Sequence, residues 1–204
     1  MSSRPMINQS LRPMEVCMYD LLILGTLMSR NMCGYKLRQV VESSLIPRRE
    51  ISNGVMYPLL AKLEDHGYIE FHTDEQDPRH TKVAQITAAG RARFLALMAA
   101  PIAPDAKRES MFRFKFRGMP AVDKAHQEAI LDDYEAQIKA DLATYEGVRT
   151  HLQEVLQAPD TNKPYVDWTI RNLDLSIALC HTKLTWITDS RQAVNQKAEA
   201  QSNG

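Results

Sequence analysis

The chain has 204 residues, of which 44% are hydrophobic and 25% are charged, a composition that excludes wholesale disorder and allows a sizeable core. Its 25 basic and 25 acidic residues give no net charge. The two halves differ slightly, because residues 1–100 hold 12 basic and 10 acidic side chains whereas residues 101–204 hold 13 and 15. This imbalance permits a nucleic-acid contact in the first half, although a mixed solvated surface would give the same counts.

The cysteines and the N-terminus indicate the compartment. Cys17, Cys33 and Cys180 show neither a pairing pattern nor metal-ligand spacing, which favours a reducing cytoplasm and small core residues. No segment approaches the ~18 consecutive apolar residues of a membrane span, and the first ten residues lack the apolar core of a signal peptide. We therefore expect a cytoplasmic protein with no cofactor, no metal and no membrane partner.

The first third of the chain predicts three helices. Residues 1–12 are polar and predict a flexible N-terminal arm. Residues 13–30 are apolar on almost all sides and begin with a proline in the first turn, so they predict a central core helix. After a break at residues 31–34, residues 35–42 predict a second, shorter helix. A connection of about eight residues leads to the third helix.

The third helix, within residues 51–69, is predicted to have two different faces. Ser52 or Asn53 is suited to cap its start, and Gly67 is suited to end it. A stripe that must be buried against other helices consists of Met56, Leu59, Leu60 and Leu63. The opposite side is small, hydrogen-bonding and mildly basic, and consists of Asn53, Gly54, Tyr57, Ala61 and Lys62. Such a surface fits a DNA major groove.

A β-hairpin follows the third helix. Residues 68–72 and 82–87 alternate with period two, and turn residues separate them. Thr87 is then expected to cap a helix from Ala88 to about Ala99. This order of elements predicts a winged-helix domain at residues 13–100. The residues near the hairpin tip, where a wing contacts phosphates, are Arg79, His80 and Lys82.

Residues 101–119 are expected to be a linker and a short connecting element. Two prolines stiffen the start of this segment. Further on, Phe112, Phe114 and Phe116 alternate with basic residues. Taken alone, this alternation predicts a strand that carries basic side chains on one side.

Residues 120–192 predict two long antiparallel helices, followed by a flexible tail at residues 193–204. Each helix carries an apolar seam with steps of three and four residues. The second helix carries a further apolar stripe, which consists of Trp168, Leu175, Leu179 and Trp186. Because one hairpin does not cover two seams, this stripe predicts a homodimer. The alternative is that it packs on the winged helix of the same chain.

Four segments in this order resemble the signatures of PadR-type bacterial transcriptional regulators: Gly34–Leu37, Ile51–Leu60, Leu63–Ile69 and Ile86–Gly90. The long C-terminal helices resemble the larger of the two PadR subfamilies. The resemblance implies a mainly α fold, in which an N-terminal winged helix-turn-helix precedes a helical dimerisation domain. It also implies a short helix at residues 107–118 and a dimer that binds a palindromic operator. The chain departs from the family at residues 83–86, where aromatic residues commonly precede the final threonine of the strand.

The resemblance and the residue types together define a predicted DNA-binding surface. Tyr57 matches the recognition-helix tyrosine of the family, and the resemblance implies that Gly34 and Tyr35 open a helix whose amides face phosphate. We expect Asn53 to contact a base through its amide. Phosphate contacts, unless the side chains are merely solvated surface charges, are expected from Lys36, Lys62, Arg79 and Lys82. The complete predicted set is Gly34, Tyr35, Lys36, Ser52, Asn53, Gly54, Tyr57, Lys62, Arg79, His80 and Lys82.

The expected function is repression by a dimer that competes with polymerase for the promoter. Some relatives bind phenolic acids between their domains, and the resemblance implies a similar effector pocket lined here by Tyr19, Phe112, Phe114, Tyr165 and Trp168, although aromatic residues at such spacings are commonly core. The alternatives are an activator without a ligand and a winged helix that binds protein instead of DNA. An enzyme is not expected, because the six histidines lack ligand spacing and no phosphate loop or nucleophile motif is present.

Overall fold

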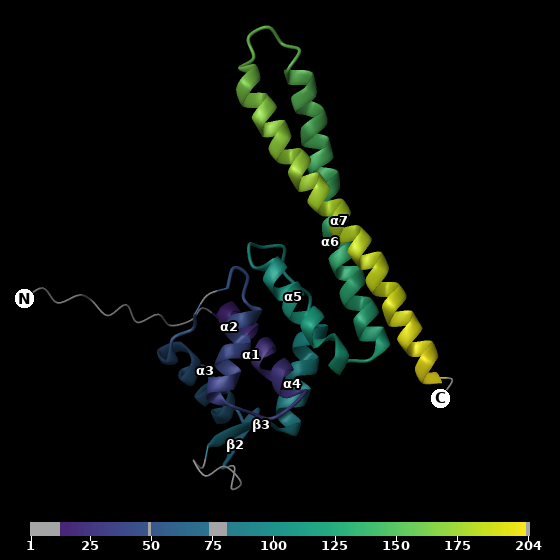
Figure 1. Ribbon diagram of the computed structural model, residues 1–204. Coiled ribbons are helices and arrows are strands. Elements are labelled where there is room, and N and C mark those ends of the chain that lie inside the picture. The colour runs from purple at the N-terminus through teal and green to yellow at the C-terminus, as the bar shows by residue number, and fades with distance from the viewer. Residues whose placement is uncertain (1–12, 49, 74–80, 203–204) are drawn as a thin grey trace, which may run out of the picture. The chain divides into compact units, whose positions relative to one another are not determined.

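The structure is a computed structural model that describes residues 13–48, 50–73 and 81–202, and the chain divides into two compact units (Figure 1). The first unit, residues 1–123, contains α1 (Pro13–Leu27), β1 (Met32–Cys33), α2 (Gly34–Ser44), α3 (Asn53–Asp65), β2 (Ile69–Thr73), β3 (Lys82–Ile86), α4 (Ala88–Ala99), α5 (Arg108–Gly118) and the 3-10 turn η1 (Met119–Ala121). The second unit, residues 124–204, contains α6 (Lys124–Val155) and α7 (Lys163–Ser202). The predicted fold class, a winged helix-turn-helix followed by long contacting helices, is confirmed.

Helix α1 forms the centre of the first unit. Leu21, Ile23 and Leu24 are each at most 1% exposed, and α1 contacts α2, α3, α4, α5 and β3. Its apolar sequence therefore reflects burial on nearly every side. The helix ends at Leu27, three residues before the predicted end, because Met28 and Ser29 form a turn back onto it.

Helix α3 has the predicted ends. Ser52 is its N-cap residue, and the amides of Val55 and Met56 donate to the Ser52 carbonyl at 3.0 Å. At the other end Gly67 adopts a φ of 69°, the left-handed conformation that favours glycine. The amides of Gly67 and Tyr68 donate to the last carbonyls of the helix, which is the Schellman arrangement. The predicted stripe of Met56, Leu59, Leu60 and Leu63 is buried, with at most 3% exposure.

Three antiparallel strands in the order β1-β3-β2 form the sheet. Ile69 pairs with Ile86, and both side chains are buried, so the hairpin is anchored at its base. Strand β1 pairs Met32 with Ala84. The sequence did not indicate β1, because two residues are too few to show period-two alternation. The predicted wing residues Arg79 and His80 lie outside the described residues.

Residues 108–118 form helix α5, so the strand expected from their alternation is wrong and the helix implied by the family resemblance is confirmed. Phe112 and Phe116 are one helical turn apart and stack with their ring centroids 5.9 Å apart. Phe112 and Phe114 are both buried, and α5 packs against α1. The buried ammonium group of Lys115 donates to the Ala100 carbonyl at 2.5 Å. The aromatic residues on α5 therefore alternate because two sides of the helix are covered.

Helices α6 and α7 form an antiparallel hairpin with a shared apolar seam. Leu131 and Ile138 of α6 and Ile187 of α7 are at most 1% exposed. The Arg191 guanidinium contacts the carboxylates of Asp132 at 2.6 Å and Glu135 at 2.5 Å, and so connects the two helices. Hydrogen bonds from Lys139 and Arg191 lower the pKa of the Glu135 carboxyl.

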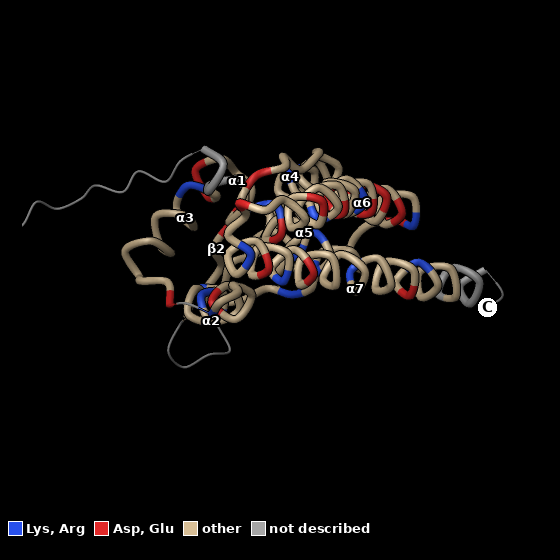
Figure 2. The backbone as a smooth tube through the Cα atoms, turned by 90° about the horizontal axis from the view of Figure 1, so that it is seen from above, with Lys and Arg blue, Asp and Glu red and all other residues tan. Residues whose placement is uncertain are grey.

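The two units carry opposite net charge. Residues 1–123 hold 17 basic and 13 acidic side chains, a net of +4, whereas residues 124–204 hold 8 and 12, a net of −4. Charged positions of both signs are distributed along α6 and α7 (Figure 2). The boundary at residue 123 thus shows a stronger asymmetry than a division of the sequence at residue 100. A positive first unit is favourable for contact with nucleic acid.

Candidate nucleic-acid interface

The exposed side of α3 is the first part of the candidate interface. Asn53 is the first residue of the helix and is exposed, as is Gly54. The side chain of Ser52 makes no capping hydrogen bond, and its carbonyl accepts the amides of Val55 and Met56. Tyr57 is 55% exposed although the helix face behind it is buried. The buried apolar side of α3 thus anchors the helix, and its opposite, polar side faces solvent.

The start of α2 lies against the same tyrosine. A Cβ atom placed on Gly34 would lie 3.4 Å from Cε1 of Tyr57, so the tyrosine ring packs directly over the glycine. Tyr35 is 57% exposed, and its hydroxyl accepts a hydrogen bond from Nε2 of Gln39 at 2.9 Å. The Arg38 guanidinium lies 5.7 Å from the Tyr35 ring centroid. Gly34, Tyr35 and Tyr57 therefore lie on one surface, and contact of this surface with DNA stays a prediction.

A concave surface, here called the recognition groove, joins α2, α3 and the hairpin. It has a volume of about 490 Å³ and is lined by Cys33, Gly34, Tyr35, Tyr57, Leu60, Ala61, Glu64, Phe71, Thr81 and Lys82. The groove brings Gly34, Tyr35 and Tyr57 together with Lys82 of the hairpin, whereas the predicted residues Lys36, Ser52, Asn53 and Gly54 do not line it. Sequence reasoning missed Glu64 and Phe71. Glu64 could have been found from its spacing, because it follows Tyr57 by seven residues and so lies on the same side of the helix.

Lys62 belongs to a different side of α3. It follows Tyr57 by five residues, which is about 140° around a helix, and it does not line the recognition groove. Instead, its charge acts on Asp20 of α1. Burial raises the pKa of the Asp20 carboxyl, and the nearby charges of Arg93, Lys62 and His66 oppose that effect. Lys62 thus contributes to the field around a buried carboxyl.

A buried carboxylate fixes the start of α3. Glu42 of α2 is 8% exposed, and its Oε1 accepts a hydrogen bond from the Ile51 amide at 3.0 Å. Arg38 is in contact with both groups, with Nε 3.8 Å from Oε1 of Glu42 and Nη1 3.5 Å from the Ile51 carbonyl oxygen. Because Ile51 directly precedes the N-cap residue Ser52, this arrangement, here called the Glu42 clamp, fixes where α3 begins.

We expect Glu42→Ala to lower the free energy of unfolding by about 1–3 kcal/mol, because the buried Ile51 amide loses its acceptor. Glu42→Gln retains an acceptor oxygen and should have a smaller effect. Urea unfolding measures both changes, and hydrogen exchange at the Ile51 amide shows whether the effect is local. Wild-type stability and unchanged Ile51 exchange in Glu42→Ala would show that the clamp does not stabilise this junction.

The residues predicted for an effector pocket fall into two groups. Tyr19, Phe112 and Phe114 belong to the first unit and are buried, with at most 7% exposure. Tyr165 and Trp168 belong to α7 in the second unit and are 73% and 74% exposed. The first group packs as core and the second group is open to solvent. An effector site formed by both groups stays a prediction.

The stripe predicted on α7 is exposed. Trp168, Leu175, Leu179 and Trp186 are 74%, 59%, 51% and 43% exposed. Trp168 and Leu175 are seven residues apart, as are Leu179 and Trp186, which is the heptad spacing of coiled-coil seams. The side of α7 that packs on α6 is a different one, with Ile177, Cys180 and Ile187 buried. These four exposed residues are here called the α7 stripe.

Two further properties concern the described part of the chain. No described helix combines the length and hydropathy that crossing a membrane requires. Within the same residue ranges, no three His, Cys, Asp or Glu side chains are grouped so that they could hold a metal ion.

The first unit is a winged helix-turn-helix domain, a class of DNA-binding domain. It has three helices, the third with an exposed polar face, followed by a β-hairpin in a short sheet. Residues 23–96 match the model of the Transcriptional regulator PadR-like family. The matched residues lie within the winged helix-turn-helix unit, and this part of the chain is similar to that family of transcriptional regulators. The long helices α6 and α7 are consistent with its larger subfamily. Comparison with curated protein sequences gave no significant match.

Several solved structures are similar to this chain. Bacillus subtilis PadR in complex with operator DNA is 21% identical, with 89% of this chain and 99% of that chain covered and a TM-score of 0.40. The same protein in complex with p-coumaric acid is 18% identical, with 87% and 99% covered and a TM-score of 0.37. The PadR-like regulator BC1756 from Bacillus cereus is 23% identical, with 87% and 98% covered and a TM-score of 0.35.

Proposed function

We propose that this protein is a homodimeric repressor that binds a palindromic operator through α3 and the recognition groove. The observation that carries the proposal is the meeting of Tyr57, Gly34 and Lys82 in one groove beside the exposed polar side of α3. Helix α3 enters a major groove, where the Asn53 amide can pair with an adenine edge. One DNA strand then follows the recognition groove with Lys82 as a phosphate contact, and Lys36, which does not line the groove, contacts a phosphate outside it.

The α7 stripe supports the dimer. Its four large apolar side chains are exposed at heptad spacing, and a second copy of α7 offers a surface of matching character to pack against them. A two-fold dimer presents two α3 helices to one side of the DNA. Helices held about 34 Å apart reach successive major grooves, and their two-fold relation explains a palindromic operator.

Repression follows when the operator overlaps a promoter, because the bound dimer then excludes polymerase. An effector relieves repression only if it binds better to a dimer whose recognition helices are wrongly spaced. We propose a small aromatic acid as that effector, and p-coumaric acid is the ligand of the B. subtilis protein. A thermal-shift screen of hydroxycinnamic acids and vanillate tests this part of the proposal. Absence of stabilisation by every compound would remove its basis.

We expect Asn53→Ala to weaken binding to the operator by about 1–3 kcal/mol, because a base loses its amide partner. Binding to a random duplex should stay unchanged, since phosphate contacts dominate there. Fluorescence anisotropy with the DNA upstream of the protein's own gene and with a random duplex of equal length measures both. An equal loss on the two duplexes would show that Asn53 does not read a base.

A further inference from the structure

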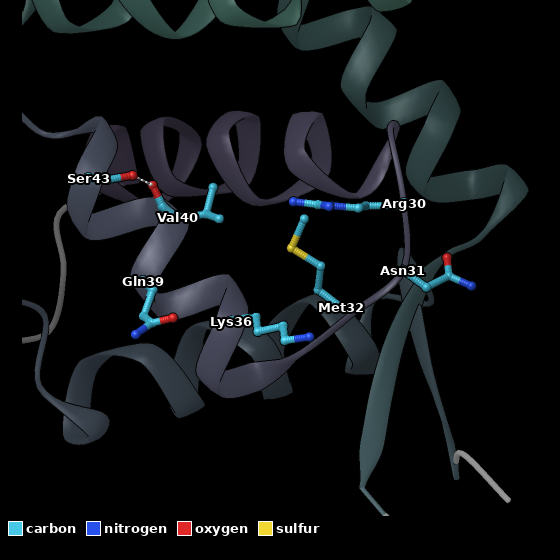
Figure 3. A pocket seen from close by; sticks show the side chains of 7 residues that line it. All are labelled: Arg30, Asn31, Met32, Lys36, Gln39, Val40 and Ser43. Carbon is cyan, nitrogen blue, oxygen red and sulfur yellow. Dashed lines mark hydrogen bonds between the residues drawn. The ribbon is translucent and has the colours of Figure 1, made fainter. Parts of the chain in front are cut away.

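A second cavity lies on another side of α2 from the Glu42 clamp. It has a volume of about 470 Å³, is here called the α2 pocket, and is lined by Arg30, Asn31, Met32, Lys36, Gln39, Val40 and Ser43. Figure 3 shows the Arg30 side chain extending from the turn after α1 towards α2. Lys36 extends from the first turn of α2 towards the same turn, with Met32 between the two cations (Figure 3). The α2 pocket thus joins two basic side chains from different elements.

The charges of the α2 pocket are all of one sign. Its lining includes two cations and no carboxylate, and Arg30, Lys36, Gln39 and Ser43 are exposed. The acidic residue of α2, Glu42, is buried and bonded to the Ile51 amide instead. An anion that enters therefore meets cations and neutral hydrogen-bond donors, and no described lining residue repels it.

A neighbouring cavity extends the basic surface. It has a volume of about 350 Å³, and it shares Arg30, Met32 and Val40 with the α2 pocket. It adds Arg117, whose guanidinium donates to the Ser44 hydroxyl at 2.6 Å. Arg30 lies at the junction of the two cavities, so a change at this residue alters both.

The position of the α2 pocket connects it to the candidate interface. Lys36 follows Gly34 by two residues, and the Tyr57 ring packs against Gly34. The recognition groove uses Cys33, Gly34 and Tyr35 of the same helix start. The α2 pocket and the recognition groove therefore adjoin at the N-terminus of α2. In helix-turn-helix domains the first of the two helices, here α2, crosses the DNA backbone.

We propose that the α2 pocket binds a DNA backbone phosphate that lies outside the recognition groove. Arg30 and Lys36 are its two cationic ligands. This assignment rests on the proposed function. A phosphate contact releases condensed counterions from DNA and is independent of sequence. Arg30 contributes affinity on any duplex and leaves base preference to α3. The contact lengthens the protein's footprint by the phosphates that flank the bases read by α3.

The test compares full-length wild type with Arg30→Gln and Arg91→Gln. Arg91 is an exposed cation of α4 in the same unit and lines neither cavity, so it is the matched control for the loss of one positive charge. Dissociation constants are measured by fluorescence anisotropy between 50 and 200 mM salt on a random duplex and on the DNA upstream of the gene. Circular dichroism confirms that each variant is folded.

Arg30→Gln should reduce the slope of log affinity against log salt by about one unit on both duplexes. The loss of affinity between the two salt concentrations is then about 3.5-fold smaller than in wild type. Arg91→Gln should keep the wild-type slope. Wild-type slope and affinity in Arg30→Gln, or an equal change in Arg91→Gln, would overturn the assignment.

A titration with inorganic phosphate distinguishes a DNA contact from a site for a free anion. Amide shifts of ¹⁵N-labelled protein should show weak phosphate binding at residues 30–43, and Arg30→Gln should abolish it. Saturation of the pocket by inorganic phosphate with no effect of Arg30→Gln on DNA binding would overturn the DNA assignment. A wild-type protein that does not prefer its upstream DNA contradicts the proposed function, whereas the Arg30 effect on the random duplex would still stand.

Discussion

A Leu175→Glu variant should be a monomer at micromolar concentration, whereas the wild-type protein should be a dimer. Leu175 is 59% exposed in the middle of the α7 stripe. Pairing two stripes would bury it, and an unpaired carboxylate in an apolar contact opposes association by several kcal/mol. Sedimentation velocity measures the change. Thr185→Glu is the control, because Thr185 is exposed on α7 and belongs neither to the stripe nor to the seam with α6.

The same variant should lose operator affinity by roughly 100-fold or more. Two DNA-binding domains joined in one dimer bind the two half-sites of the operator with a high effective concentration, and separate monomers do not. Binding of a single half-site should be unchanged. A Leu175→Glu protein that remains dimeric would mean that the stripe packs elsewhere, and the dimer would then need another surface.

We expect Gly90→Ala to destabilise the first unit by more than about 3 kcal/mol. A Cβ atom on Gly90 would lie 2.0 Å from the Tyr68 carbonyl oxygen and 2.8 Å from Cγ1 of Ile86. A shift of the Tyr68 carbonyl would break its hydrogen bond from the Thr87 amide, which is 3.1 Å long. Thr87 in turn caps α4, because its hydroxyl accepts the Gly90 amide at 3.0 Å. The substitution therefore affects the junction between the hairpin and α4.

Gly147→Ala is the matched control for Gly90→Ala. Nothing lies within 4 Å of a Cβ atom at Gly147 in α6, so alanine should stabilise that helix by about 0.5–1 kcal/mol. Urea unfolding followed by circular dichroism gives both values, and hydrogen exchange separates the two units. Wild-type stability of the first unit in Gly90→Ala would contradict the close packing of α4 against Tyr68 and Ile86.

Local signals explain the part of the fold that the sequence predicted. Ser52 and Gly67 bound α3, and Thr87 caps α4 at the residue where the sequence placed the cap. The apolar stripe of α3 and the seam between α6 and α7 follow helical spacing, so burial could be assigned from position alone. These features depend on residues fewer than ten positions apart.

Features that depend on distant residues escaped prediction. Strand β1 exists because Met32 meets Ala84, more than fifty residues away. In the sequence Glu42 resembles any other helical glutamate. Only the fold places the Ile51 amide next to its carboxylate. Likewise, the grouping of Lys82 with Tyr57 depends on how α3 packs against the hairpin. Sequence pattern shows which residues are exposed, whereas packing decides which of them meet.

The central claim is that the protein reads DNA as a dimer. Sedimentation of the labelled upstream DNA with increasing protein, together with competition by a random duplex of equal length, tests it most directly. We expect one dimer per operator and an affinity for the upstream DNA at least about 1,000-fold above that for the random duplex. Equal affinity for the two duplexes, or a complex that contains one subunit, would contradict the claim.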